Sequence, residues 1–288
     1  MKIVVASGKG GTGKTTIAVN IASLMAERSD QVCYADCDVE EPNGYLFLKP
    51  TIDREWPAAI PIPQVDENLC DACGKCKEIC EFSAITVILE KVMVFPELCH
   101  GCGGCALACP PKAITEVPRE IGLVMAGHSG HLHFVSGRLN VGEPLAVPLI
   151  REVKKEIGKY TDVIIDASPG TACPMVETVS DADYVLLVTE PTPFGLNDLK
   201  LAVETVRKLD LPYSVIINRA GIGDKGVQKF CYLENIPIMA EIPDDRRAAE
   251  LYSKGEMIYK ALPEFKKYFE DIVEKIDEMQ KKYERNIK

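Results

Sequence analysis

A glycine-rich loop near the amino end constrains the fold of this 288-residue chain more than any other feature. The stretch GKGGTGKTT, residues 8–16, follows the short apolar run KIVVAS and leads into a run with helical spacing, GKTTIAVNIASLMAER. Glycines allow backbone N–H groups to converge on phosphate oxygens, and a helix that begins at the loop adds the positive end of its dipole. A strand, a phosphate loop and a helix in this order predict a parallel βαβ unit that binds a nucleotide.

The residues of this loop have separate expected roles. Lys14 is expected to reach the β- and γ-phosphates, and the Thr15 hydroxyl is expected to bind Mg²⁺. The whole predicted phosphate cradle comprises Gly8, Lys9, Gly10, Gly11, Thr12, Gly13, Lys14, Thr15 and Thr16.

The rest of the chain alternates strand-like and helix-like segments, with one interruption. Short apolar runs rich in Val and Ile, typical of buried parallel strands, occur in QVCYADCD, DVIIDAS, DYVLLVTE, YSVIINRA and IPIMAEIPD. Helical spacing is found at residues 195–209, at 224–234 and from Pro263 onward, where Phe265, Phe269, Ile272, Ile276, Met279 and Tyr283 recur. The sequence therefore predicts an α/β P-loop NTPase with a mainly parallel sheet.

The interruption is an internal duplication. Pro57, Pro61 and Pro63 crowd together before it, and Pro118 follows it. The segments LCDACGKCKEICEFSAIT and LCHGCGGCALACPPKAIT, which we call the first and second cassettes, align at an offset of 29 residues. We expect a small α+β insert of ferredoxin type at residues 60–118, and a discontinuous ATPase domain at residues 1–59 and 119–288.

Each cassette has the spacing C-x₂-C-x₂-C-x₃-C, which is the bacterial pattern for [4Fe–4S] clusters. In two-cluster ferredoxins the fourth cysteine of each run binds the other cluster. The predicted ligands of one cluster are Cys70, Cys73, Cys76 and Cys109, and those of the other are Cys99, Cys102, Cys105 and Cys80. Zinc is the competing interpretation, but structural zinc sites use two separated cysteine pairs. The first cassette departs from the pattern in having Glu81 where the second has Pro110.

The phosphate loop resembles the deviant Walker A motif of the MinD/ParA/Mrp ATPases, a superfamily that includes the nitrogenase iron protein. Lys9 matches the additional lysine of that motif. In the family this lysine reaches the phosphates of a partner subunit across a nucleotide sandwich. The resemblance, which covers roughly residues 1–55 and 120–260, therefore implies a homodimer that binds ATP or ADP with Mg²⁺ and hydrolyses ATP slowly without a partner.

The same resemblance extends to two acidic segments. DCDVEEPN matches the first switch of the family, in which Asp38 would activate the attacking water and Asp36 would support Mg²⁺ and its waters. VIIDASPG matches the second switch, in which Asp166 would hold a water on Mg²⁺. Lys9, Lys14 and Asp38 are therefore the predicted catalytic residues.

Two further segments match the part of the family that binds the base. Asn218 in IINRA would read the edge of adenine, with Arg219 stacking nearby, and Pro243 and Asp244 in IPDD would close over the base. Without the resemblance, each of these carboxylates has an ordinary alternative role as a helix cap or a salt-bridge partner.

Other candidate residues have weaker patterns. The histidines in GHSGHLHF (His128, His131 and His133) match no metal-ligand spacing, and hairpin or surface roles are favoured. Cys173 could bridge a cluster across a dimer, and Cys231 stands alone, but a second cysteine is missing for either to form a shared site. The acidic and basic residues of the C-terminal helix favour core packing over membrane anchoring.

Composition limits the functional class. A net charge of −10 argues against a general nucleic-acid or anionic-membrane surface, and no run approaches the ~20 apolar residues of a membrane span. We expect no signal peptide, and the many cysteines outside a disulfide pattern favour a cytoplasmic, reducing location. Three functions remain open: nucleotide-gated electron transfer or redox sensing with an unknown redox partner, iron–sulfur cluster delivery to an unknown client, and a positioning switch of the MinD/ParA kind. Complete ligation by eight cysteines favours retained clusters, and hence the first function.

Overall fold

The computed structural model describes residues 1–287, and the side chains of residues 1–281. Its strands are β1 (Lys2–Ala6), β2 (Val32–Cys37), β3 (Thr51–Val65), β4 (Ile85–Ile88), β5 (Lys91–Val94), β6 (Ile114–Ser129), β7 (Leu132–Leu139), β8 (Asp162–Ala167), β9 (Tyr184–Thr189), β10 (Tyr213–Ala220) and β11 (Ile238–Pro243). The helices are α1 (Lys14–Ala26), α2 (Gly44–Leu48), α3 (Lys75–Ile79), the 3₁₀ helix η1 (Pro96–Leu98), α4 (Gly104–Leu107), α5 (Ala146–Ile157), α6 (Cys173–Val179), α7 (Pro193–Lys208), α8 (Gly226–Leu233), α9 (Arg246–Ser253), α10 (Ile258–Ala261) and α11 (Pro263–Ile287).

Within residues 1–287, nine strands form one sheet in the order β11-β10-β9-β1-β8-β2-β7-β6-β3. The strands from β11 to β7 pair in parallel, with Val5 opposite Asp166 and Asp36 also opposite Asp166. The predicted mainly parallel α/β fold is therefore confirmed. Because the carboxyl ends of parallel strands meet at one edge of the sheet, the loops after β1, β2 and β8 lie together there.

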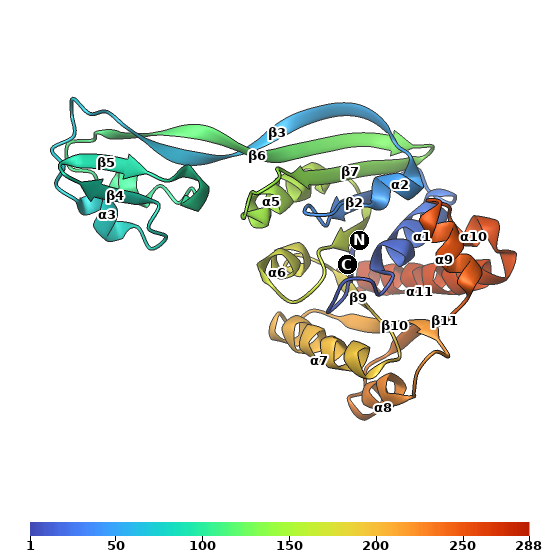
Figure 1. Ribbon diagram of the computed structural model, residues 1–288. Helices are drawn as coiled ribbons and strands as arrows, with labels where there is room; N and C mark the ends of the chain where they lie inside the picture. Colours follow the sequence, from blue (N-terminus) through green and yellow to red (C-terminus); the bar gives the residue numbers. More distant parts are fainter. Residues whose placement is uncertain (288) are drawn as a thin grey trace.

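Helices cover both faces of the sheet, which explains why the parallel strands are apolar at successive positions. Ile3 and Val5 of β1 pack on the face covered by α1 and α11, whereas Val4 and Ala6 pack on the face covered by α5, α6 and α7 (Figure 1). In α11, Phe269, Ile272, Val273 and Ile276 are fully buried, so the predicted core packing of this helix is confirmed as far as its side chains are described; Tyr283 lies outside that part. Among the described residues, no helix is both long and apolar enough to cross a bilayer.

A long two-stranded ribbon projects from the edge of the sheet (Figure 1). It consists of β3 and β6, which pair antiparallel from Thr51 opposite His128 to Val65 opposite Ile114. The predicted domain boundaries at residues 60 and 118 fall inside these two strands. The prolines near these boundaries lie within the two strands. Pro57, Pro61 and Pro63 are tolerated because β3 is an edge strand and needs no donors on its outer side. Pro118 is tolerated because β6 pairs with β7 only from Gly122 onward.

The segment between the two strands of the ribbon, residues 66–113, packs around a small core of its own. It contains α3, η1, α4 and the antiparallel hairpin of β4 and β5. In this core, Cys76 and Ile85 of the segment pack together with Ile114, the first residue of β6. The backbone N–H of Asp66 donates to the carbonyl of Ala113 at 2.7 Å, so the segment enters and leaves at one point. Figure 1 shows it held away from the sheet and its helices by the length of the ribbon.

The hairpin of β6 and β7 is the main element that the sequence analysis did not predict. It inserts two strands between β2 and β3, with His128 opposite His133. The three histidines do not converge. His128 Nδ1 lies 3.0 Å from Asp53 Oδ2, His131 Nδ1 lies 2.8 Å from Asp30 Oδ1, and His133 packs against the ring of Tyr160. The favoured hairpin and surface roles are confirmed.

Candidate nucleotide site and cysteine cavities

The phosphate loop joins β1 to α1 and lines a cavity at the carboxyl edge of the sheet. The first helical hydrogen bond of α1 runs from Ile17 N–H to the Gly13 carbonyl at 3.0 Å. Gly13 has φ of 87°, and a Cβ there would lie 2.2 Å from Asn218 Nδ2. Only glycine is compatible with both this backbone conformation and this close approach.

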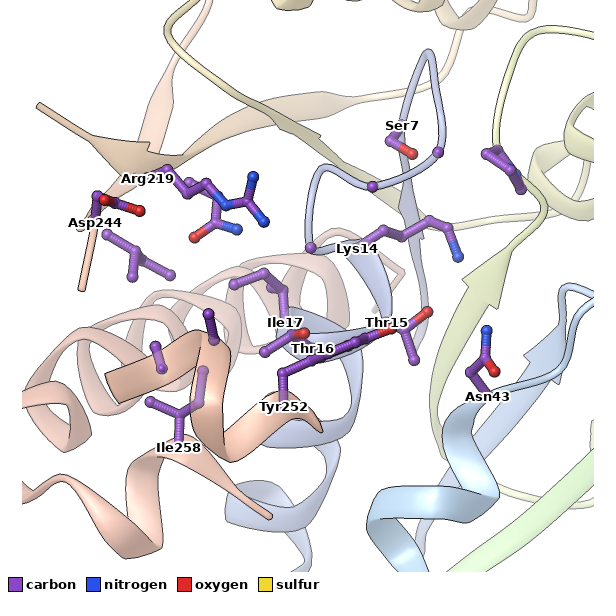
Figure 2. Close-up of a pocket in the computed structure, with 18 of the residues that line it drawn as sticks. Ser7, Lys14, Thr15, Thr16, Ile17, Asn43, Arg219, Asp244, Tyr252 and Ile258 are labelled. Carbon is purple, nitrogen blue, oxygen red and sulfur yellow. The ribbon is translucent and has the colours of Figure 1, made fainter. Parts of the chain in front are cut away.

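Most of the predicted site residues meet in this cavity. From the loop and the first switch it is lined by Lys9, Gly10, Gly11, Gly13, Lys14, Thr15, Thr16 and Asp38. From the predicted base region it is lined by Asn218, Arg219, Pro243 and Asp244. Figure 2 shows Arg219 and Asp244 on one side of the loop, with Lys14 pointing the opposite way, toward the side of Asn43. The residues predicted to bind phosphates and those predicted to bind the base therefore lie at different parts of one cavity.

Four predicted residues lie outside the cavity lining: Gly8, Thr12, Asp36 and Asp166. Gly8 packs under the start of α7, where a Cβ would meet the Asp198 carbonyl oxygen at 2.2 Å. Thr12 is buried, and its carbonyl accepts a hydrogen bond of 2.8 Å from Asn218 Nδ2. Asn218 is thus held by the phosphate loop itself. The buried pair Asp36 and Asp166 lies behind Lys14.

Lys14 is held by acidic residues of both switches. Its ammonium forms ion pairs with Asp166 and, at 3.6 Å, with Asp38 Oδ2. The hydroxyl of Tyr34 donates to the other oxygen of Asp166 at 3.1 Å. Burial disfavours the charged ammonium, but Asp166 and Asp38 outweigh it and hold the pKa of Lys14 above its usual range. A phosphate group, which carries more negative charge than a single carboxylate, would compete with Asp166 and Asp38 for this cation.

The carboxylates of the first switch are costly to ionise. Burial, which removes water from the charged form, raises the pKa of Asp38 from 3.8 to about 6, although Lys14 acts in the opposite direction. Burial and the charge of Asp166 also raise the pKa of Asp36. Asp36 accepts hydrogen bonds from Gly44 N–H at 2.9 Å and Asp38 N–H at 3.2 Å, so it connects the switch to the first turn of α2. A divalent cation at this place would offset the excess of negative charge.

Two smaller cavities lie in the segment at the end of the ribbon, and each contains four cysteines. One is lined by Cys70, Cys73, Cys76 and Cys109. The other is lined by Cys99, Cys102, Cys105 and Cys80, and reaches Pro61, Pro63 and Glu116 of the ribbon. Each cavity therefore combines three cysteines of one cassette with the fourth of the other, which is the arrangement that crossed ligation requires.

The backbone around these cysteines is suited to thiolates. Three backbone N–H groups donate to cysteine sulfur: Ala84 to Cys80 at 3.3 Å, Gly101 to Cys99 at 3.4 Å, and Ala113 to Cys109 at 3.3 Å. Hydrogen bonds to sulfur favour the thiolate and tune a bound cluster. Gly74, Gly101 and Gly103 all have positive φ, between 65° and 80°, which allows the chain to wrap tightly around each cavity. The residues present thus fit two cubane clusters.

Among the described residues, no group of three or more His, Cys, Asp or Glu side chains is spaced to hold a single metal ion. The four thiolates of a cubane bind four different irons and therefore stand farther apart than the ligands of one zinc ion. Outside the cavities, Cys33, Cys37 and Cys231 are buried. Burial raises the pKa of the Cys231 thiol to about 11, which keeps it protonated. Cys173 is exposed at the start of α6.

The family model of the CobQ/CobB/MinD/ParA nucleotide binding domain matches residues 3–258, which is most of the chain. The chain belongs to this family. The match includes the phosphate loop, both acidic switches and the base region. The matched range also includes residues 60–118.

Relatives of this chain include proteins of archaea. An uncharacterised protein of Methanocaldococcus jannaschii is 32% identical over 94% of this chain and 96% of its own length. An iron-sulfur cluster carrier protein of Pyrococcus horikoshii is 25% identical over 93% of this chain and 83% of its own length. The septum site-determining protein MinD of Pyrococcus horikoshii, solved as a complex with Mg-ADP, superposes with a TM-score of 0.61 at 20% identity, covering 97% of this chain and 96% of that one. This last likeness is one of fold.

Sequence reasoning missed several residues of the nucleotide cavity. Asn43, just before α2, and Tyr252 of α9 line the cavity but were not predicted to do so, although Asn43 is the last residue of DCDVEEPN. Tyr34 of β2 lies outside the lining and contacts the site through its hydrogen bond to Asp166. One indication was available for Tyr34, which is an aromatic residue with a polar tip inside an otherwise apolar strand. Buried tyrosine hydroxyls usually have a hydrogen-bond partner, so this position predicted a polar contact in the core.

Proposed function

We propose that this chain is a Mg-ATP-dependent ATPase that switches between nucleotide states as a homodimer and carries two [4Fe–4S] clusters. In this proposal residues 1–59 and 119–288 form the ATPase domain, and residues 60–118 form a ferredoxin-type insert. The nucleotide state would control electron transfer to or from a redox partner protein, or sensing of the redox state. The single observation that carries the proposal is the pair of cysteine cavities, each completed by the other cassette.

At the nucleotide site, the phosphates would take the place of Asp38 and Asp166 as partners of Lys14. Thr15 would bind Mg²⁺ directly, and Asp36, Asp38 and Asp166 would hold its waters. Once Lys14 has turned to the phosphates, Asp38 is free to orient the attacking water and accept its proton. Asn218, Arg219, Pro243 and Asp244 would bind the base at the opposite end of the cavity. Lys9 of each subunit would contact the phosphates held by the partner, so closure requires both.

When bound, the two clusters would supply one-electron storage and transfer. The polypeptide would hold them through the eight cysteines and the N–H donors to sulfur described above. Cys73 and Cys102 are the exposed members of the two sets, one at each cavity. A partner protein could therefore approach either cavity without unfolding the insert.

The direct test is anaerobic purification followed by iron and sulfide counting, and an electron-resonance titration with and without Mg-ATP. We expect about eight irons per chain, and a signal that changes when a non-hydrolysable ATP analogue is added. Lys14→Ala should remove the response to the analogue and leave the iron content unchanged. A colourless, zinc-loaded protein would refute the cluster assignment. Electron-resonance spectra that are the same with and without the nucleotide would refute the coupling between nucleotide state and the clusters.

Cluster delivery is the second candidate, and it is favoured by the name of the iron-sulfur cluster carrier protein of Pyrococcus horikoshii. A carrier must release its clusters, whereas an electron-transfer protein must keep them. Incubation of the loaded protein with an apo-ferredoxin and Mg-ATP separates the two. Iron that remains on this chain supports electron transfer, and rapid transfer of iron to the acceptor supports delivery.

A further inference from the structure

Glu190 binds two cations of the nucleotide site from behind. It follows the last residue of β9 and is 8% exposed. One carboxylate oxygen lies 2.7 Å from Arg219 Nη1, and the other lies 3.7 Å from Lys9 Nζ. Both cations line the nucleotide cavity, Lys9 in the phosphate loop and Arg219 in the predicted base region, whereas Glu190 does not line it.

The backbone at Glu190 is fixed by the turn that leads into α7. Its carbonyl accepts a hydrogen bond from Thr192 N–H at 2.8 Å. A Cβ on Gly195 would lie only 2.3 Å from the same carbonyl oxygen, and the Thr189 hydroxyl donates to the Gly195 carbonyl at 2.9 Å. The carboxylate therefore sits on a rigid part of the fold, while the lysine and arginine side chains are long and partly exposed, at 33% and 47%.

The two cations are held unequally. Arg219 makes a short hydrogen-bonded ion pair, while Lys9 makes only a longer electrostatic contact. If Lys9 leaves, Glu190 keeps a charged partner, so no unpaired carboxylate is left in a mostly buried place. Release of Lys9 toward a competing anion therefore has a low cost.

We propose that Glu190 is a positioning residue that holds Lys9 on its own subunit and so opposes premature closure of the dimer. This inference rests on the proposed nucleotide-sandwich dimer, because Lys9 must leave Glu190 before it can reach the phosphates of the partner. Subunits in which Glu190 holds Lys9 cannot close, so they weaken the apparent affinity of the dimer. Removing the charge of Glu190 frees Lys9 in these subunits and strengthens the apparent affinity. Phosphates bound to the partner supply the competing anion, so ATP releases the lysine.

The test is Glu190→Gln, which keeps the shape of the side chain and removes its charge. Sedimentation of the full-length protein with Mg²⁺ and a non-hydrolysable ATP analogue measures the dimer dissociation constant. We expect the dissociation constant of the dimer to fall by about fivefold for each subunit, because a partly exposed ion pair contributes at most about this much. The change should vanish in a Lys9→Ala background. The matched control is Glu241→Gln, at a glutamate of β11, which lies two strands from β9 in the sheet. Among the described side chains Glu241 bonds only Gln228, so this variant should change nothing.

Each outcome has a distinct meaning. If the wild type does not dimerise with the analogue, the proposed sandwich is wrong, and this inference falls with it. If the wild type dimerises but Glu190→Gln does not strengthen the dimer, the role of Glu190 is wrong and the sandwich dimer still stands. The same holds if Glu190→Gln strengthens the dimer equally in the Lys9→Ala background. Glu190→Asp keeps the charge but moves it back by one methylene, and it should give a smaller shift of the same sign. It decides the question if the glutamine variant does not fold.

Discussion

At the scale of single residues, Gly13 illustrates how one position in the phosphate loop joins two parts of the site. Gly13 is the residue before α1 and has a left-handed backbone conformation, with φ of 87°. The absence of a side chain leaves room for Asn218. Gly10 lies three residues earlier, where a Cβ would meet nothing within 4 Å.

We therefore expect Gly13→Ala to destabilise the protein and Gly10→Ala to have little effect on its folding. Strain at a positive φ and the displacement of Asn218 together should cost about 1–3 kcal/mol. Thermal unfolding of the nucleotide-free protein measures both variants. Equal melting temperatures for the two variants would show that the close packing of Asn218 against the loop is not maintained in solution.

The burial of Asp38 predicts a pH dependence of stability. Its folded pKa of about 6 lies above the 3.8 of an exposed aspartate. With respect to Asp38, the protein is therefore most stable below pH 3.8, where Asp38 is protonated in the folded and the unfolded state. This stability is lost as the pH rises through about 6, because the buried carboxyl must then ionise. Against Asp38→Asn, which cannot ionise, the nucleotide-free wild type should lose at most about 3 kcal/mol between pH 4 and pH 7.

Denaturant unfolding of both proteins at several pH values provides the comparison, since other titrating groups cancel in the difference. A difference that stays constant across this range would mean that water reaches Asp38 freely. With Mg²⁺ and nucleotide bound, the same carboxylate gains positive neighbours, so the pH dependence should shrink.

The sequence alone predicted the residues that lie in contiguous motifs, and it missed contacts between distant segments. The loop residues from Lys9 to Thr16, except Thr12, line the cavity as a run, because one βαβ unit places them there. Tyr34 and Asp166 are 132 positions apart, and Lys9 reaches Glu190 only because β1 pairs with β9. No local pattern records such pairings.

At the scale of elements, the two cassettes exchange their last cysteines across the insert. Each short helix, α3 or α4, contains the third cysteine of its cassette, and the fourth cysteine, which follows the helix, lies at the other cavity. The hydrogen bonds from Ala84 to Cys80 and from Ala113 to Cys109 repeat at equivalent positions of the duplication.

Single substitutions can reveal this exchange. Cys80→Ala and Cys99→Ala should perturb the same electron-resonance signal, although they lie in different cassettes. Cys109→Ala and Cys70→Ala should perturb the other signal. Each variant should lose up to about half of the iron, because one cluster loses a ligand. If Cys80→Ala instead altered the signal that depends on Cys70, each cassette would be binding its own cluster.

Strands with continuous apolar runs could be predicted from sequence, whereas β3 and β6 could not. Buried parallel strands are recognised by composition, and six of them were found in this way. The ribbon strands are largely exposed, and the prolines in β3 resemble a linker. Their pairing with each other is a long-range feature, because residues 66–113 separate the two strands in the sequence.

At the scale of the whole molecule, the insert and the sheet have separate apolar cores joined by the ribbon. Replacing residues 66–113 with an Asn-Gly turn should therefore leave a ribbon that closes as a hairpin, since Val65 and Ile114 already face each other. We expect the shortened protein to bind Mg-ATP with wild-type affinity and to contain no iron. Calorimetric titration and iron analysis test this, and loss of nucleotide binding would mean that the insert supports the switch regions.

The prolines of β3 have a further consequence for the behaviour of the protein at high concentration. An outer strand of 15 residues would ordinarily invite another chain to add a strand along its free edge, a common route to aggregation. Pro57, Pro61 and Pro63 supply no N–H groups, and Asp53, Arg54 and Glu55 place charges beside them. The free edge of β3 can thus extend far into solvent and still be poorly suited to pairing with a strand of another chain.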